Sequence, residues 1–161
     1  HECGDRYTFA ELCKEAEETD YITSRIDVNN KCFLAPENMT EAIKSYCNNN
    51  DLIIPDTAGE IAAVVYKSLA DSYADTVMQI EKNLDITYDA IYVIGGGANA
   101  GYLNQLTADS TGKTVVAGPA EATAIGNIMA QMIADSVFKN LKEARACVRD
   151  SFDIKRFEQK R

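Results

Sequence analysis

Apolar residues in the first half of the chain recur at helical spacing behind three polar capping sequences. Each capping sequence places a Thr or Asn three residues before a Glu, the arrangement that satisfies free N–H groups where a helix begins. Apolar positions then recur every three or four residues, and for longest behind the third cap. The pattern predicts helices over residues 8–19, 38–47 and 57–84, with Lys67 on the solvent side of the third helix.

The pattern changes after Thr87 to short apolar runs that alternate with helical segments. The predicted elements are strands at 90–94 and 114–117 and helices at 98–111, 119–136 and 137–149, followed by a charged tail at 153–161. Pro119 suits the first turn of its helix, where a missing N–H is harmless, and Glu121 suits the same turn through the helix dipole. Such alternation predicts an α/β unit with a parallel pair of strands joined by a helix.

Composition and charge exclude several classes of protein. The chain has 161 residues, is 46% hydrophobic and carries a formal net charge of −9, which disfavours nucleic acid as a partner. Its five cysteines are odd in number and scattered without a C-x-x-C pair, which indicates a reducing compartment, and we expect a cytoplasmic location. With His1 as the only histidine, no structural metal is expected. The apolar runs are too short for a membrane span.

The strongest chemical signal is the run Gly95-Gly96-Gly97, which lies between an apolar strand and a helix. Backbone without side chains at such a turn lets a ligand approach closely, and a nucleotide is the natural candidate. The dinucleotide pattern G-x-G-x-x-G is not matched here, and the phosphate-binding pattern G-x-x-x-x-G-K-[ST] is absent. The alternative is that the glycines only permit a tight turn packed against another element.

Several further segments lie before and after this turn in the sequence, in a definite order. They are Phe33-Leu-Ala-Pro36, Asn38-Met39, Ala42-Ile43, Gly59-Glu-Ile61, Ser68-Leu-Ala70, Leu103-Asn-Gln-Leu-Thr-Ala-Asp109, Ala117-Gly-Pro119 and Glu121-Ala-Thr-Ala-Ile-Gly-Asn127. In this order and spacing, the whole of residues 1–161 resembles the C-terminal part of the FGGY family of carbohydrate kinases. Within that family it is most similar to the branch that phosphorylates L-rhamnulose.

The resemblance implies an actin-like ATPase fold with ribonuclease-H-like domains, here an α/β fragment that is helix-rich and has a short parallel sheet. Residues 1–161 would be part of the C-terminal nucleotide-binding domain, without the N-terminal catalytic and sugar-binding domain. The implied reaction transfers the γ-phosphate of ATP, with magnesium, to the 1-hydroxyl of L-rhamnulose. In the family the glycine turn faces the adenosine of ATP, so Gly95, Gly96 and Gly97 inherit that role. The family's adenine-facing asparagine falls by spacing at Ala100, and Asn99 stands one residue earlier.

No residue of this chain is expected to be catalytic. Asp89 and Asp109 are interpreted as solvated or capping groups, and Asn104 and Gln105 are expected to face a domain surface. The chain lacks an initial methionine and a signal peptide, so we expect it to begin inside a larger protein and, alone, to be inactive. Uncovered sheet edges would favour self-association. Two alternatives stay open, which are a family member acting on another ketose or polyol and a non-catalytic actin-like assembly module.

Overall fold

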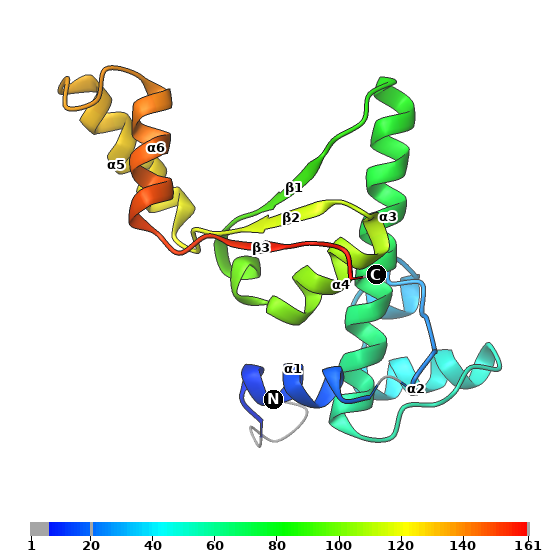
Figure 1. The fold of residues 1–161 in the computed structure, drawn as a ribbon. Coiled ribbons are helices and arrows are strands. Elements are labelled where there is room, and N and C mark those ends of the chain that lie inside the picture. Colours follow the sequence, from blue (N-terminus) through cyan, green and yellow to red (C-terminus); the bar gives the residue numbers. More distant parts are fainter. Residues whose placement is uncertain (1–6, 20, 161) are drawn as a thin grey trace. The chain divides into compact units, whose positions relative to one another are not determined.

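The protein is described by a computed structural model that covers residues 7–19 and 21–160 (Figure 1). These residues divide into two compact units, the first ending at Ile86 and the second beginning at Thr87. The division falls where the sequence pattern changes from purely helical to alternating. Each unit is therefore described by itself.

The first unit is helical. Its elements are α1 (Phe9–Glu17), the 3-10 helix η1 (Lys31–Phe33), α2 (Met39–Asn49) and α3 (Ala58–Leu84). Helix α1 packs against α3, and a core of buried apolar side chains forms where Ile22, Ile43 and Val64 meet. The three predicted helices are confirmed, with ends that shift by two residues or fewer.

Capping side chains explain where the three α-helices of this unit begin. Thr8 and Thr57 each form a complete capping box, in which the hydroxyl accepts from the N–H of the Glu three residues later and that carboxylate accepts from the cap's own N–H. At α2 the Asn38 side chain accepts a hydrogen bond from the N–H of Glu41 at 2.9 Å. Capping side chains of this kind typically stabilise a helix by about 1 kcal/mol each.

The capping carboxylate of α3 is also tied to a distant part of the first unit. Glu60 Oε1 accepts a hydrogen bond from Tyr21 Oη at 2.5 Å, and Oε2 accepts from the N–H groups of Asp56 and Thr57 at 2.5 and 3.1 Å. These hydrogen bonds hold the pKa of Glu60 below its ordinary value of 4.5, and the bond from Tyr21 has the largest effect. Hydrogen bonds to the ionised form therefore stabilise the fold only while Glu60 is charged.

We expect the free energy of unfolding to fall as the pH drops below about 4.5. The pKa of Glu60 is lower in the folded chain than in the unfolded chain. The stabilisation by Glu60 is therefore complete above the pKa of the unfolded chain and is lost as the pH falls through the pKa of the folded chain. Urea denaturation between about pH 3 and pH 6 measures this dependence. Glu60→Gln should flatten part of it. Glu41→Gln, at the same position in α2, is the matched control. An acid dependence that is identical in Glu60→Gln and in the unaltered chain would contradict the assignment.

Lys67 does not face solvent as predicted. Its residue is 8% exposed, and Nζ donates hydrogen bonds to the carbonyl oxygens of Ile22 at 3.0 Å and Thr19 at 3.4 Å. The prediction was wrong because the segment after α1 crosses α3 at this point and supplies acceptors for the ammonium group. Helical periodicity carries no information about such a crossing.

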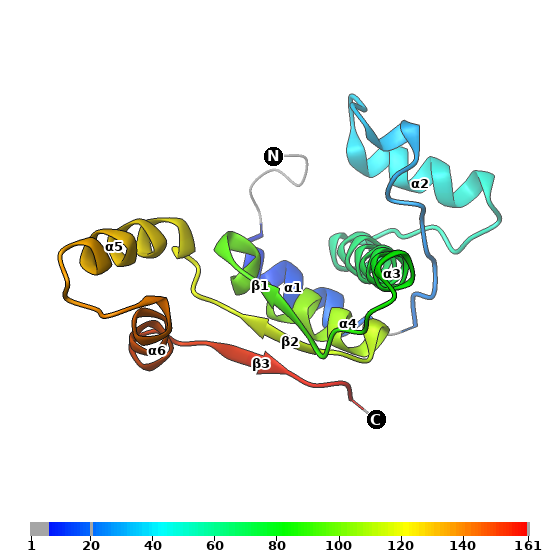
Figure 2. The ribbon, with the colours of Figure 1, turned by 90° about the horizontal axis from the view of Figure 1, so that it is seen from above.

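The second unit contains a small sheet and its connecting helices. Its elements are β1 (Ala90–Val93), the 3-10 helix η2 (Gly95–Asn99), α4 (Gly101–Thr111), β2 (Thr114–Ala117), α5 (Ala122–Ala134), α6 (Leu141–Ser151) and β3 (Lys155–Phe157). Strand β2 lies in the centre, parallel to β1 and antiparallel to β3 (Figure 2). The predicted parallel pair is confirmed. The sheet is mixed rather than purely parallel, because β3 forms in the predicted charged tail.

The first residues of three predicted helices in this unit need correction. The glycines themselves form η2, so the helix predicted from residue 98 begins at Gly101. Pro119 follows a cis peptide bond and lies before α5 rather than in its first turn. Glu121 is the N-cap residue of α5, and its side chain makes no capping hydrogen bond. The helix predicted over 137–149 is α6, displaced towards the C-terminus because Asn140 caps it.

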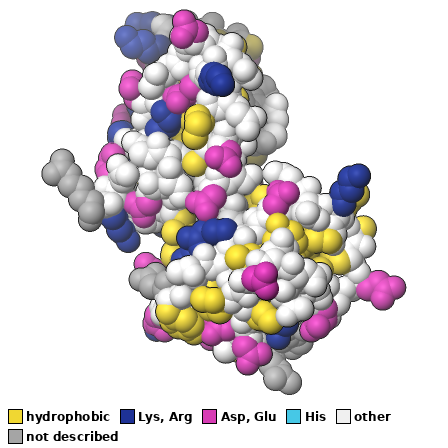
Figure 3. Space-filling model, turned by 90° about the vertical axis from the view of Figure 1, so that its right-hand side faces the viewer, with side chains coloured by type: hydrophobic (Ala, Val, Ile, Leu, Met, Phe, Trp, Pro, Cys, Tyr) yellow, Lys and Arg dark blue, Asp and Glu magenta, His cyan; other side chains and the backbone are white. Residues whose placement is uncertain are grey.

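Large apolar side chains reach the surface of both units. Leu34 is 87% exposed, Tyr92 is 74% exposed and Ile94 is 62% exposed. The face drawn in Figure 3 carries hydrophobic side chains interspersed with acidic and basic groups. Over residues 7–19 and 21–160, no helix combines the length and the apolar character that crossing a membrane requires. The expected self-association stays a prediction.

Candidate functional site

The candidate site lies where the two parallel strands end. Strand β1 leads into η2 and β2 leads into Gly118 and Pro119, so both loops leave the same edge of the sheet. The N–H of Gly118 donates to Val93 O at 2.9 Å, and the N–H of Gly95 donates to Pro119 O at 3.3 Å. The carboxyl ends of parallel strands are where ligands bind in open α/β sheets. Two hydrogen bonds thus join the two loops that would form such a site.

The three glycines of the turn differ in whether the fold requires them. Gly95 has φ +73°, a conformation that other residues rarely adopt. A Cβ atom at Gly97 would lie 3.3 Å from Val93 Cγ1, a tight contact. At Gly96 a Cβ atom would meet no described atom within 4 Å, and φ is not positive. The fold of the described residues therefore explains Gly95 and Gly97 but places no demand on Gly96.

Asn104 is hydrogen-bonded to the backbone of the glycine turn. This residue is 3% exposed, and its Nδ2 donates to the carbonyl oxygens of Gly97 at 3.2 Å and Ala98 at 3.4 Å. The prediction that Asn104 faces a domain surface was wrong. Its position one turn into α4, where its amide can reach carbonyl oxygens of the preceding turn, is the local signal that could have identified it.

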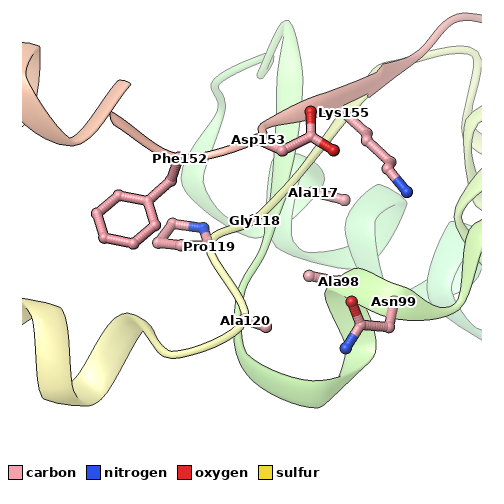
Figure 4. Close-up of a pocket in the computed structure, with 9 residues that line it drawn as sticks. All are labelled: Ala98, Asn99, Ala117, Gly118, Pro119, Ala120, Phe152, Asp153 and Lys155. Carbon is pink, nitrogen blue, oxygen red and sulfur yellow. The ribbon is translucent and has the colours of Figure 1, made fainter. Parts of the chain in front are cut away.

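A cavity of about 170 Å³ opens beside this turn (Figure 4). It is lined by Ala98 and Asn99 from η2, by residues 117–120 from the end of β2, and by Phe152, Asp153 and Lys155 from the C-terminal segment. Pockets that enclose a whole ligand usually measure about 300–1,000 Å³. The cavity is therefore large enough for part of a nucleotide. Of the four predicted contact residues, Asn99 lines it, whereas Gly95, Gly96 and Gly97 belong to the adjoining turn.

The acidic residues considered above do not assemble into a reactive centre. Asp109 is half-buried, and its Oδ1 accepts from Gln105 Nε2 at 3.0 Å and from the N–H of Lys160 at 2.7 Å. It is therefore a structural anchor rather than a solvated group. Asp89 is exposed and precedes β1. Across the described ranges, no three His, Cys, Asp or Glu side chains come close enough to hold a metal ion.

Comparison with known proteins shows the family to which the sequence belongs. Residues 2–134 match the C-terminal domain of the FGGY family of carbohydrate kinases. The chain belongs to this family. Its fold is accordingly part of an actin-like ATPase domain.

Three relatives are rhamnulokinases from bacteria. The chain is 47% identical to that of Bacillus subtilis (strain 168) over 154 residues, 45% identical to that of Oceanobacillus iheyensis over 151 residues, and 39% identical to that of Lactiplantibacillus plantarum over 157 residues. These alignments cover 96%, 94% and 98% of this chain and 32% of each relative. The chain thus spans about a third of the length of the curated relatives it matches. The family match ends at residue 134, so α6 and β3 lie beyond it.

Proposed function

We propose that this chain is the adenosine-facing part of the nucleotide-binding domain of a rhamnulokinase. In the longer enzyme, the γ-phosphate of ATP would be transferred, with magnesium, to the 1-hydroxyl of L-rhamnulose. The observation that carries the proposal is Gly96, whose bare backbone lies at the carboxyl end of a parallel strand pair where packing places no demand on it. Membership of a kinase family and the rhamnulokinase relatives support it.

The chemistry divides between this chain and the rest of the enzyme. Phosphoryl transfer needs a base near the sugar hydroxyl, carboxylates that position magnesium and donors around the β- and γ-phosphates. The described residues offer a cavity, a glycine turn and an asparagine at its edge, which can orient a nucleoside. The proposal assigns binding of the nucleotide to this chain and assigns the base, the metal ligands and the sugar pocket to the remainder. This chain alone should form no sugar phosphate.

The experiment compares the activity of the longer protein that contains this chain on several sugars. ADP formation is measured with ATP and with L-rhamnulose, L-fuculose or xylulose, and the present chain alone serves as the inactive reference. We expect the highest kcat/KM with L-rhamnulose. A clear preference for another sugar would replace rhamnulokinase by a different sugar kinase of this family. Nucleotide binding without ADP formation on any sugar would instead favour a non-catalytic actin-like module.

A further inference from the structure

The C-terminal segment, residues 152–160, begins at the candidate site and runs antiparallel beside β2 towards the other end of the sheet. Strand β3 within this segment pairs with β2. Beyond β3, Gln105 Nε2 donates to Glu158 O at 2.8 Å, and Asp109 Oδ1 accepts from the N–H of Lys160 at 2.7 Å. These bonds attach the C-terminal segment to α4 as well as to the sheet. The C-terminal segment is therefore held in place by the rest of this unit.

The end of β2 is shaped to let this segment approach. Gly118 has φ +121°, and a Cβ atom there would lie 2.9 Å from Asp153 O. A side chain at this position would therefore push Asp153 away from the loop that lines the cavity. The glycine permits a close approach between two backbones, which is one of the few structural needs that only glycine meets. The C-terminal segment thus forms a wall of the cavity, opposite η2.

The wall brings three side chains with different chemistry to the cavity, which are those of Phe152, Asp153 and Lys155 (Figure 4). The Phe152 ring lies beside Pro119, whereas the Lys155 side chain extends from β3 on the side where Asn99 lies. Among the residues that the structure describes, the side chain of Lys155 has no hydrogen-bond or ion-pair partner. A cation without a partner at the edge of a cavity is an attractive contact for an anionic group.

We propose that the C-terminal segment is the third wall of the nucleotide site and that Lys155 contacts a phosphate group of the nucleotide. The inference rests on the proposed function, because the nucleotide is the ligand which that function assigns to this cavity. The adenosine part of a nucleotide carries no charge, so the ammonium group would add affinity only when phosphate is present. Lys155 binds and orients the phosphate group, and no bond-breaking step is assigned to it.

The test uses neighbouring residues on the two faces of β3. Successive residues of a strand point to opposite faces, so Arg156 carries the same charge on the face away from the cavity. Titration calorimetry of the longer kinase would compare ADP with adenosine for the unaltered protein and for Lys155→Gln, Lys155→Arg and Arg156→Gln. We expect Lys155→Gln to raise the Kd for ADP about fivefold and to leave the Kd for adenosine unchanged. Lys155→Arg should preserve most of the affinity, and Arg156→Gln should have no effect.

Each other outcome has a defined meaning. An equal loss for ADP and adenosine would show that Lys155 shapes the wall but touches no phosphate, which overturns the inference. An unchanged Kd for ADP in Lys155→Gln would overturn it as well, while normal nucleotide binding by the unaltered protein would leave the proposed function standing. If the unaltered protein bound neither ligand, the proposed function would fail together with the inference.

Discussion

Replacing Gly96 with Val is expected to weaken ATP binding by the longer protein that contains this chain by more than about tenfold, or about 1.4 kcal/mol. A Cβ atom at Gly96 would meet no described atom within 4 Å, and the residue has no positive φ. The described part of the folded chain therefore has room for a Cβ atom at this position. The loss of affinity would come from the ligand, whose approach to the bare backbone the isopropyl group would block.

The design separates a clash with the ligand from damage to the fold. ATP affinity is measured by calorimetry and the melting temperature by scanning fluorimetry. Gly126→Val is the matched control, because Gly126 is exposed on α5 and a Cβ atom there also meets no described atom within 4 Å. An ATP affinity that does not change in Gly96→Val would remove the adenosine assignment. A lowered melting temperature in that variant alone would show that the turn itself needs Gly96.

The elements that the sequence predicted well depend on neighbours in the sequence. The cap at Thr57 and the apolar positions behind it define α3 without reference to any other segment, and both ends of that helix were predicted correctly. The parallel pairing of β1 and β2 also follows from the local order of strand, helix and strand. Local signals are sufficient wherever the partners of a residue lie within a few positions along the chain.

The elements that the sequence did not predict depend on distant partners. Strand β3 is three residues long and lies in a charged stretch, so only its pairing with β2 makes it a strand. Lys67 is buried because carbonyl oxygens 45 and 48 residues away accept its hydrogen bonds. Neither contact can be predicted from the spacing of apolar residues or from the number of charged residues.

The candidate site is divided in the same way. The glycine run predicted a turn after β1, and Asn99 within that turn lines the cavity. Phe152 and Lys155 line the same cavity from a segment more than fifty residues later, where no motif marks them. Their place depends on the antiparallel addition of β3 to the sheet. One wall of the site was thus predictable from the sequence, and the opposite wall required the fold.

Gly118→Ala is expected to lower the free energy of unfolding of the second unit by about 3 kcal/mol. A non-glycine residue held at an unfavourable backbone conformation typically costs about 1–3 kcal/mol, and Gly118 has φ +121°. The added Cβ atom would also lie 2.9 Å from Asp153 O. That neighbour is backbone, so it can give way only if the C-terminal segment moves. The backbone conformation and the close contact both disfavour the folded state of the variant.

Urea denaturation, followed by circular dichroism, measures this effect, with Gly126→Ala as the control. Gly126 lies inside α5, where an exposed Gly is less favourable than Ala by about 1 kcal/mol, so that variant should be at least as stable as the unaltered chain. A Gly118→Ala variant with unchanged stability would mean that the C-terminal segment can leave the end of β2 at no cost. The wall that it forms would then be too loose to hold Lys155 at the nucleotide. The stability of this one variant therefore bears directly on whether the third wall can contribute to binding.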